Sequence, residues 1–184
     1  MNPTNFFDTF PVLETKRLKL IQITHQHAAD IFAIFANNNV TEHYDCFSFT
    51  TLSEAESIIS HHEKKFQTKT GIRWGITLKG CDNIIGTIGF NHFEIGRTGV
   101  IGYELNEKFW SQGIITEAIK CITEFGFSIM SLRRIEASVA PENIASQKVL
   151  ATNGFTKEGI MRDKGFWKNQ FQTFVVYSKL STDL

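Results

Sequence analysis

The sequence predicts an α/β domain in which helices flank a mixed β-sheet. Two observations favour this class. Three strand-like runs joined by short turns occupy the middle of the chain, which predicts an antiparallel meander. A long amphipathic helix and another strand follow, and a crossover of this length implies parallel pairing with the last meander strand. With a closing hairpin, the expected order is β-α-α-β-β-β-α-β-α-β-β.

The first half of the chain predicts one strand and two helices. Residues 17–23 form the strand, after a loose leader. Thr24 is a capping residue for a helix that runs to about residue 37. Thr51 and Glu54 fit a capping box, which opens a second helix through about residue 66.

The second half alternates strands and helices. We expect strands at 73–78, 84–93, 99–106, 134–139, 155–161 and 171–180. Apolar residues at helical spacing predict helices at 113–130 and 143–153. Gly154 suits the end of the second of these helices. The final hairpin loop contains Lys168 and Asn169.

Composition supports one domain, 1–184, with a core over about 13–180. The 184 residues carry 19 Lys+Arg against 19 Asp+Glu, and 42% are hydrophobic. Zero net charge argues against a nucleic-acid or anionic-membrane binder. The absence of a secretory signal or an 18-residue apolar run predicts a cytoplasmic protein. Three separated cysteines predict no disulfide framework and no metal site.

The segment 103–118 contains the first motif that indicates a ligand site. In it, a strand runs through a short loop into the long helix. A helix amino end presents unpaired N–H groups and about half a positive charge. Gly113 lets the backbone approach a ligand closely, so the arrangement suits a phosphate. The alternative is a plain turn at Gln112 and Gly113, since the Walker and dinucleotide glycine patterns are absent.

Asn143 and Ser146 form a second constellation, because residues three apart share one helical face. Their alternative role is capping, with Asn143 as the N-cap. The two roles are compatible, because parallel strands direct both helix starts toward the same sheet edge, where ligands bind in open α/β sheets.

Jointly, these motifs resemble the GNAT superfamily of acetyl-CoA-dependent N-acetyltransferases, in particular its Rim-type branch of ribosomal-protein N-terminal acetyltransferases. The motifs are 13–18 (LETKRL), 102–105 (GYEL), 110–118 (WSQGIITEA), 143–146 (NIAS) and 153–155 (NGF). The resemblance implies a GNAT fold and the transfer of acetyl from acetyl-CoA to a primary amine.

The resemblance also implies roles for individual residues. The CoA pyrophosphate would be held by the backbone of Gln112, Gly113, Ile114, Ile115 and Thr116. Leu105 and Asn106 would pair with the pantetheine through backbone groups, and Asn143 would hydrogen-bond its arm. Ser146 would protonate the leaving thiolate. Lys148 could reach a CoA phosphate, although an exposed lysine is more often solvated.

Two features depart from the family. The signature Gln/Arg-x-x-Gly-x-Gly/Ala has Trp110 and Ile115 at its first and last places, and Ile115 could crowd the phosphates. A Rim-type relative has a catalytic glutamate where this chain has Gly165. The best remaining base is Glu104, whose alternative role is a solvated or ion-paired glutamate. Asp163 is the fallback, and a water chain from either is compatible.

The acceptor stays open at this point: a protein N-terminus, a polyamine, an aminoglycoside or an amino acid. An unperturbed α-amine, with a pKa near ~7.8, needs less help from a base than a lysine near ~10.4. An acidic cleft for a basic substrate could come from Glu42, Asp45, Glu54 and Glu56. The alternatives are a catalytically silent CoA-binding regulator and, less favoured, a nucleotide-binding protein. A homodimer is compatible with the family.

Overall fold

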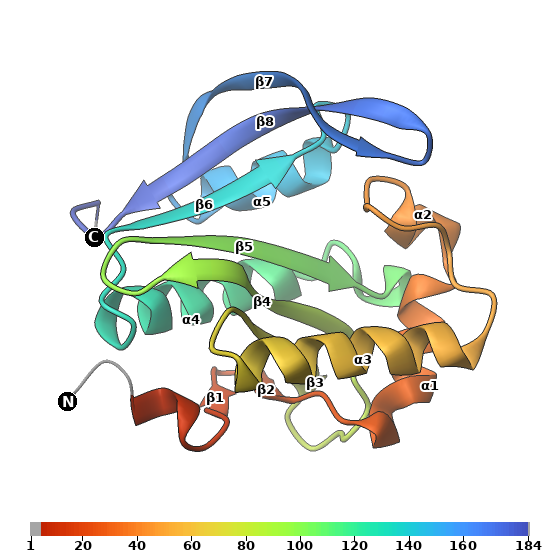
Figure 1. Ribbon diagram of the computed structural model, residues 1–184. Helices are drawn as coiled ribbons and strands as arrows, with labels where there is room; N and C mark the ends of the chain where they lie inside the picture. The colour runs from red at the N-terminus through yellow and green to blue at the C-terminus, as the bar shows by residue number, and fades with distance from the viewer. Residues whose placement is uncertain (1–4, 184) are drawn as a thin grey trace.

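Residues 5–183, described in a computed structural model, build one eight-stranded sheet with helices on both faces (Figure 1). Residues 1–4 and 184, at the two ends of the expected domain, lie outside the described residues. The strands are β1 (Leu13–Glu14), β2 (Leu18–Gln22), β3 (Ile72–Leu78), β4 (Gly86–Glu94), β5 (Thr98–Leu105), β6 (Arg134–Val139), β7 (Thr156–Trp167) and β8 (Gln170–Leu180). The α-helices are α1 (Ala28–Phe35), α2 (Asn38–Thr41), α3 (Leu52–Gln67), α4 (Ile114–Ser128) and α5 (Ile144–Thr152). Short 3₁₀ turns are η1 (Asn5–Phe7), η2 (His25–His27) and η3 (Glu107–Phe109).

The sheet has the order β1-β2-β3-β4-β5-β6-β8-β7, and only β5 and β6 pair in parallel. Their pairing covers Thr98 to Val100 on β5, opposite residues 134–136 on β6. Beyond Val100 the two strands continue without pairing, so the sheet splays open at their carboxyl ends. The predicted mixed sheet, meander and parallel crossover are confirmed.

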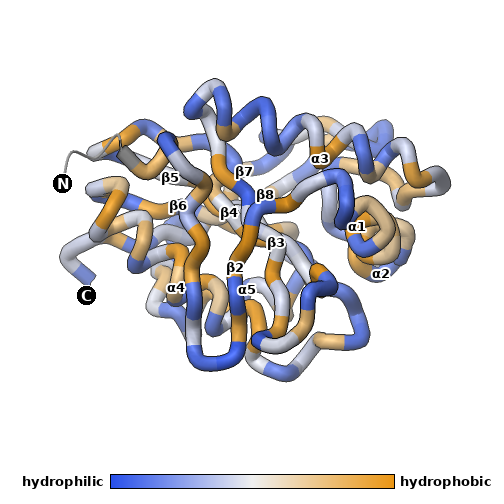
Figure 2. The backbone as a smooth tube through the Cα atoms, turned by 90° about the horizontal axis from the view of Figure 1, so that it is seen from below, coloured by the Kyte–Doolittle hydropathy of each residue, from blue (hydrophilic) through white to orange (hydrophobic). Residues whose placement is uncertain are grey.

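The helices divide between the two faces of the sheet. Helices α1 to α3 cover one face and α4 and α5 cover the other, as Figures 1 and 2 show from two directions. Helix α4 buries Ala118, Ile119 and Ile122 against the sheet in the main core. A second apolar cluster, which includes Ile34, Phe35 and Ile59, joins α1 to α3. The splay between β5 and β6 therefore opens in a sheet that is packed on both sides.

Two features of the first half were not predicted. The leader is not loose, because it contains η1 and strand β1, which pairs with β2. The helix predicted for 24–37 is found as η2 followed by α1, but a separate short helix, α2, comes after it. The break comes at Asn37, whose backbone is extended and whose side chain accepts the N–H of Asn39 as the cap of α2. The capping box at Thr51 and Glu54 is confirmed at α3.

The final hairpin is longer than predicted. Strand β7 runs to Trp167 instead of residue 161, with irregular pairing between Met161 and Gly165. The predicted turn residues Lys168 and Asn169 do connect the strands, both with left-handed φ angles of 51° and 60°. This pair of left-handed residues matches the tight turns that join twisted strands. The extra length carries the hairpin tip toward α2 (Figure 1).

Candidate active site

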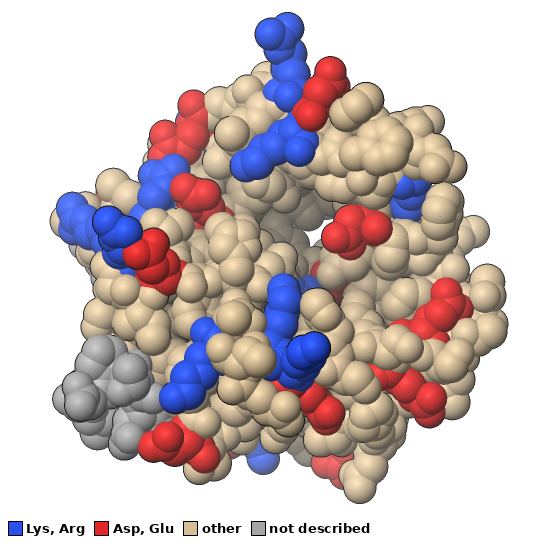
Figure 3. Space-filling view, viewed as in Figure 1, with Lys and Arg blue, Asp and Glu red and all other residues tan. Residues whose placement is uncertain are grey.

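One large cavity of about 760 Å³ occupies the splay between β5 and β6. It extends from the loop before α4, past the start of α5, to the segment that follows α2 and to the inner face of the β7–β8 hairpin. The end between residues 42–45 and the β7–β8 hairpin is the acceptor-side end, and Figure 3 shows the surface hollowed there. We call the whole cavity the large cavity. It brings together the two sequence motifs predicted to meet at this sheet edge.

The phosphate-loop prediction concerns the start of α4. Gly113 caps the helix with φ 71°, a left-handed conformation that a side chain would strain. The first hydrogen bond of the helix runs from the N–H of Glu117 to the carbonyl of Gly113, at 3.1 Å. The preceding N–H groups of Ile114, Ile115 and Thr116 therefore have no partner within the helix. All three residues line the large cavity.

Ile115 does not place its side chain across this loop. The residue is 9% exposed and belongs to the main core cluster. Gln112 lines the cavity, and its side-chain amide donates to the carbonyl of Lys108 at 3.1 Å. The backbone of the loop is therefore the part that a ligand can approach.

A clamp that the sequence reasoning missed holds this loop from below. Arg17 Nε donates to Glu117 Oε2 at 2.6 Å, and Arg17 Nη1 donates to the carbonyl of Gln112 at 2.9 Å. The Thr15 hydroxyl and the Arg17 N–H donate to the other oxygen of Glu117. Partial burial raises the pKa of Glu117, but these hydrogen bonds outweigh burial and lower it. The sequence signal for this clamp is the leader at 13–18, which contains Thr15 and Arg17.

Leu105 and Asn106, the two residues expected to contact pantetheine, differ in the hydrogen bonds that their backbone groups make. Asn106 donates its N–H to Ile85 at 2.8 Å, and its carbonyl accepts from Phe109 at 2.9 Å. The backbone N–H and carbonyl of Asn106 therefore each have a partner within the protein. Because successive backbone groups of a strand point in opposite directions, the N–H of Leu105 faces the splay. The Leu105 carbonyl accepts the indole N–H of Trp110 at 2.8 Å.

Asn143 and Ser146 lie at the start of α5 and both line the large cavity. Asn143 Oδ1 accepts the Ser146 N–H at 3.0 Å, so Asn143 is the N-cap and its amide nitrogen stays a donor. The Tyr103 hydroxyl, across the splay, is 3.5 Å from the Ser146 carbonyl oxygen. Burial raises the pKa of Tyr103 to about 12. Lys148 is exposed on α5 and is not among the residues that line the cavity.

Glu104 lines the large cavity from β5, and its side chain is only 2% exposed. It forms an ion pair with Arg73, whose side chain is 3% exposed and comes from β3. The Thr87 hydroxyl donates to Glu104 Oε2 at 2.5 Å. Arg73 also donates to Thr87, to Asn91 and to the Gly102 carbonyl. Glu104 is therefore an ion-paired group at the cavity wall, where both of its oxygens already accept hydrogen bonds.

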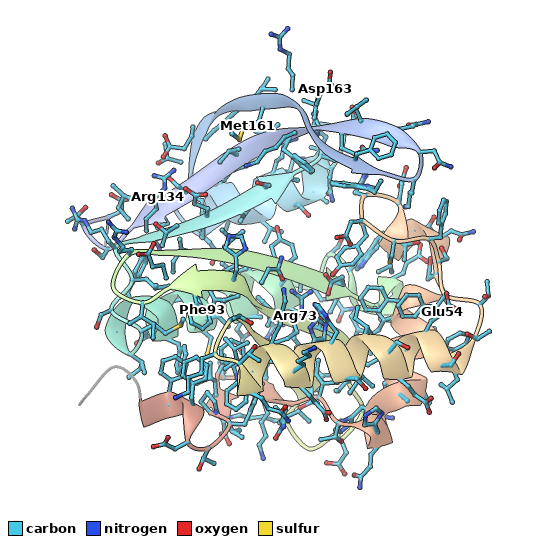
Figure 4. The ribbon with its side chains drawn as sticks, viewed as in Figure 1. Glu54, Arg73, Phe93, Arg134, Met161 and Asp163 are labelled. Atoms are coloured by element: carbon cyan, nitrogen blue, oxygen red, sulfur yellow. The ribbon has the colours of Figure 1, made fainter. Side chains whose placement is uncertain are left out.

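The fallback base and the vacant position lie on β7. Asp163 is exposed at the outer edge of the hairpin, away from the cavity (Figure 4). A Cβ on Gly165 would lie 2.4 Å from Trp167 Cζ3 and 3.1 Å from Phe174 Cε2. Trp167 and Phe174 both line the large cavity. The indole thus fills the space that a side chain at Gly165 would need.

The acceptor-side end of the cavity has acidic walls. Glu42, Asp45, Glu104 and Glu142 line the cavity, whereas none of its described lining residues is a lysine or arginine. Glu54, also considered for this role, instead caps α3 by accepting the N–H groups of Thr50 and Thr51 at 2.8 Å (Figure 4). Glu56 is exposed and is not among the lining residues. Two of the four predicted acidic residues therefore reach the site.

The wall formed by residues 37–45 is fastened at two points. Glu107 accepts amide hydrogens from Asn37 and Asn39 at 2.7 and 2.8 Å. Lys168, at the hairpin tip, donates to the Thr41 carbonyl at 2.6 Å. These contacts connect α2 to η3 and to the β7–β8 turn, and so frame the acceptor end of the cavity.

Residues 5–183 contain no cluster of three His, Cys, Asp or Glu side chains arranged to hold a metal ion. No helix in the same range is long and apolar enough to cross a membrane.

Comparison with known proteins gives consistent matches. Residues 17–156 match a family model described as acetyltransferase (GNAT) domain. The chain is 42% identical over 154 residues to the uncharacterized N-acetyltransferase YoaA of Bacillus subtilis (strain 168), covering 83% of this chain and 87% of the relative. It is 31% identical over 100 residues to the ribosomal-protein-serine acetyltransferase of Escherichia coli (strain K12), covering 54% and 56%. The crystal structure of the microcin C7 self-immunity acetyltransferase MccE with acetyl-CoA and AMP matches the fold with TM-score 0.81 at 23% identity, covering 90% of this chain and 93% of that one.

Proposed function

This chain belongs to the GNAT acetyltransferase family, and on that premise we propose that its acetyl acceptor is the α-amine of a protein. The predicted family, fold and reaction class, an N-acetyltransferase that uses acetyl-CoA, are confirmed. The ribosomal-protein-serine acetyltransferase among its relatives supports a protein acceptor. The observation that carries the proposal is one cavity that joins the α4 loop, the splayed strands and an acidic wall.

In the proposed reaction, the loop from Gln112 to Thr116 holds the CoA pyrophosphate through backbone N–H groups. The Leu105 N–H and the Asn143 amide bind the pantetheine arm. The amine nitrogen attacks the thioester carbonyl carbon, and the C–S bond breaks as the new C–N bond forms. The developing oxyanion is stabilised by backbone N–H groups near Leu105.

Two side chains complete the proton transfers. Glu104 takes the proton of the attacking amine, directly or through a water, and Ser146 protonates the leaving thiolate. Arg73 and Thr87 donate hydrogen bonds to the two oxygens of Glu104. Because these bonds stabilise the carboxylate, Glu104 is better suited to an acceptor amine that gives up its proton readily. An α-amine, with a reference pKa near ~7.8, meets that requirement better than a lysine near ~10.4. We place the reaction in the cytoplasm.

The test is thiol release from acetyl-CoA with peptides that begin with Ala, Ser or Met, beside polyamines, aminoglycosides and amino acids. Ser146→Ala and Glu104→Gln should each slow release by about 10²-fold, the typical size of an acid–base contribution. Ser128→Ala, on the exposed end of α4, should leave the rate unchanged. Release only with small amines would overturn the protein acceptor and favour the small-amine alternative.

The catalytically silent CoA-binding regulator, which the missing glutamate at Gly165 suggested, is disfavoured by the confirmed reaction class and has a different expected outcome. It predicts tight CoA binding by calorimetry and no thiol release with any amine. Assembly into a homodimer is a separate prediction, which light scattering of the full chain checks.

A further inference from the structure

A second, smaller cavity of about 270 Å³ adjoins the acceptor end of the large cavity. We call it the small cavity. It lies between α3 and strands β3 and β4, and it shares Tyr44, Asp45 and Asn91 with the large cavity. A water molecule occupies about 30 Å³ in the liquid, so the small cavity has room for a group of several heavy atoms.

The two cavities differ in the charge of the residues that line them. The cations Lys65 and Arg73 and the imidazoles of His61 and His62 line the small cavity, and its one acidic lining residue is the shared Asp45. The large cavity has the acidic residues described above and no lysine or arginine among its described lining residues. In Figure 3, acidic side chains border the hollow on one side and basic ones lie below it, over α3.

The buried ion pair stands in the partition between the cavities. Arg73 lines the small cavity, whereas its partner Glu104 lines the large one. Figure 4 shows Arg73 between α3 and the sheet. The positive end of this pair therefore faces one cavity and the negative end faces the other. A molecule with an ammonium and a nearby anion would complement both ends when it lies across the partition.

Burial and neighbouring positive charge act on His62 in the same direction. Burial is the main cause that lowers the pKa of His62 to about 3, and the positive charges of Arg73, His61 and Lys65 contribute to the same shift. Lys65 keeps donors for a ligand, because its ammonium has three hydrogens and the structure uses one, toward the Asn91 carbonyl at 2.9 Å.

We propose that the small cavity binds an anionic group carried by the acceptor a few bonds from its reactive amine, with Lys65 as the main contact. This inference rests on the proposed acetyl transfer. The amine lies in the large cavity toward Asp45 and Glu104, and the anion lies beside Lys65 and His62. A carboxylate is the simplest such group. It can be the α-carboxylate of a free amino acid or an acidic side chain close to the amino end of a peptide.

The experiment compares acceptors that differ only in this charge. Each free α-amino acid is measured against its α-carboxamide, and the peptide amide Ala-Asp-Ala against Ala-Asn-Ala, by thiol release from acetyl-CoA. We expect kcat/KM to be about tenfold higher for the charged member of at least one pair, since a hydrogen bond to a charged group has about that effect. The pair that shows the preference identifies the source of the carboxylate.

Lys65→Gln should reduce the preference to about twofold or less, because it removes the positive charge beside the anion. Lys65→Arg, which keeps the charge, should retain most of the preference. Lys64→Gln is the matched control, because Lys64 is the exposed neighbour on the same helix and does not line the cavity. A thermal melt of each variant checks that the fold is intact.

The outcomes separate a failure of this inference from a failure of the proposed acetyl transfer. If neutral amines or polyamines are acetylated as well as the carboxylate-bearing acceptors, the small cavity does not select an anion and this inference is overturned. If the preference is real but survives Lys65→Gln, its location here is overturned. If no amine in any set releases CoA, the proposed acetyl transfer itself fails.

Discussion

Arg17 and Glu117 are a hundred residues apart in sequence, yet their side chains form an ion pair at 2.6 Å directly below the α4 loop. The pair connects the start of β2 to the first turn of α4, and Arg17 also holds the Gln112 carbonyl. The position of the loop therefore depends on a strand that lies far from it in the chain.

Breaking this clamp should weaken CoA binding more than it weakens the fold. Arg17→Ala should raise the KM for acetyl-CoA and the calorimetric Kd for CoA by about three- to tenfold. The Arg17 side chain is 46% exposed, so the free energy of unfolding should fall by less than about 1 kcal/mol. Arg97→Ala breaks an exposed pair with Glu94 of the same length and should change neither. An unchanged Kd in Arg17→Ala would contradict a positioning role.

The Gly165 position should reject the glutamate that a Rim-type relative carries. Gly165→Glu should lower the free energy of unfolding by about 1–3 kcal/mol, because its Cβ meets Trp167, and it should not raise kcat. Gly159→Glu, on the same strand with nothing within 4 Å of a Cβ, should stay within about 0.5 kcal/mol of the parent. Urea denaturation compares the two. Adding Trp167→Ala to Gly165→Glu should recover part of the loss.

The buried Arg73–Glu104 pair should be sensitive to the loss of one partner. Arg73→Met leaves the Glu104 carboxylate buried without its cation and should cost about 3–5 kcal/mol of unfolding free energy. The double variant Arg73→Met with Glu104→Gln should recover part of this, because the unpaired charge is removed. Equal stability of the single and double variants, measured by chemical denaturation, would count against an unpaired charge as the cause.

His62 should make the fold sensitive to mild acid. Its pKa in the folded state is about 3, below the ordinary value of 6.5, so below pH 6.5 the unfolded chain binds a proton that the folded one does not. The free energy of unfolding should therefore fall as the pH drops from 7 to 5, by about 1–2 kcal/mol at pH 5. His62→Gln should flatten this slope in denaturation curves. His61→Gln, at the exposed neighbour, should retain it.

The Lys168 contact should matter for the acceptor and not for CoA. Lys168→Met removes the hydrogen bond from the hairpin tip to the Thr41 carbonyl, which loosens the wall of residues 37–45. The KM for the acceptor should rise about three- to tenfold while the KM for acetyl-CoA stays constant. Lys157→Met, exposed on strand β7 of the same hairpin and away from its tip, is the control. A parallel rise in both constants would point to a general loss of structure.

The sequence predicted the fold well where local pattern decides structure. The α4 helix, the α3 capping box and the β5–β6 crossover follow from periodicity, capping chemistry and connection length. The separate helix α2 and the extra length of β7 were not predicted. Asn37 and Asn39 donate to Glu107 in η3, and Lys168 at the hairpin tip donates to the Thr41 carbonyl; no local pattern contains these contacts.

The sequence predicted which two motifs meet at the site, but it did not predict the hydrogen-bond and ion-pair partners of the residues there. Gly113, Asn143 and Ser146 line the predicted edge because two helix starts follow parallel strands. The occupied backbone of Asn106 and the Arg73 partner of Glu104 arise from neighbouring strands. Such pairings become visible only when the sheet order is known.

The splay of β5 from β6 leaves the sheet incomplete until something extended enters it. A bound pantetheine arm would act as a surrogate strand against Leu105, so each turnover completes and reopens the sheet. Amide hydrogens along residues 103–105 should then exchange more slowly with solvent in the CoA complex than in the free protein. A rigid peptide-like chain with the spacing of a strand, bearing neither thiol nor nucleotide, would compete for the same gap and so serve as an inhibitor.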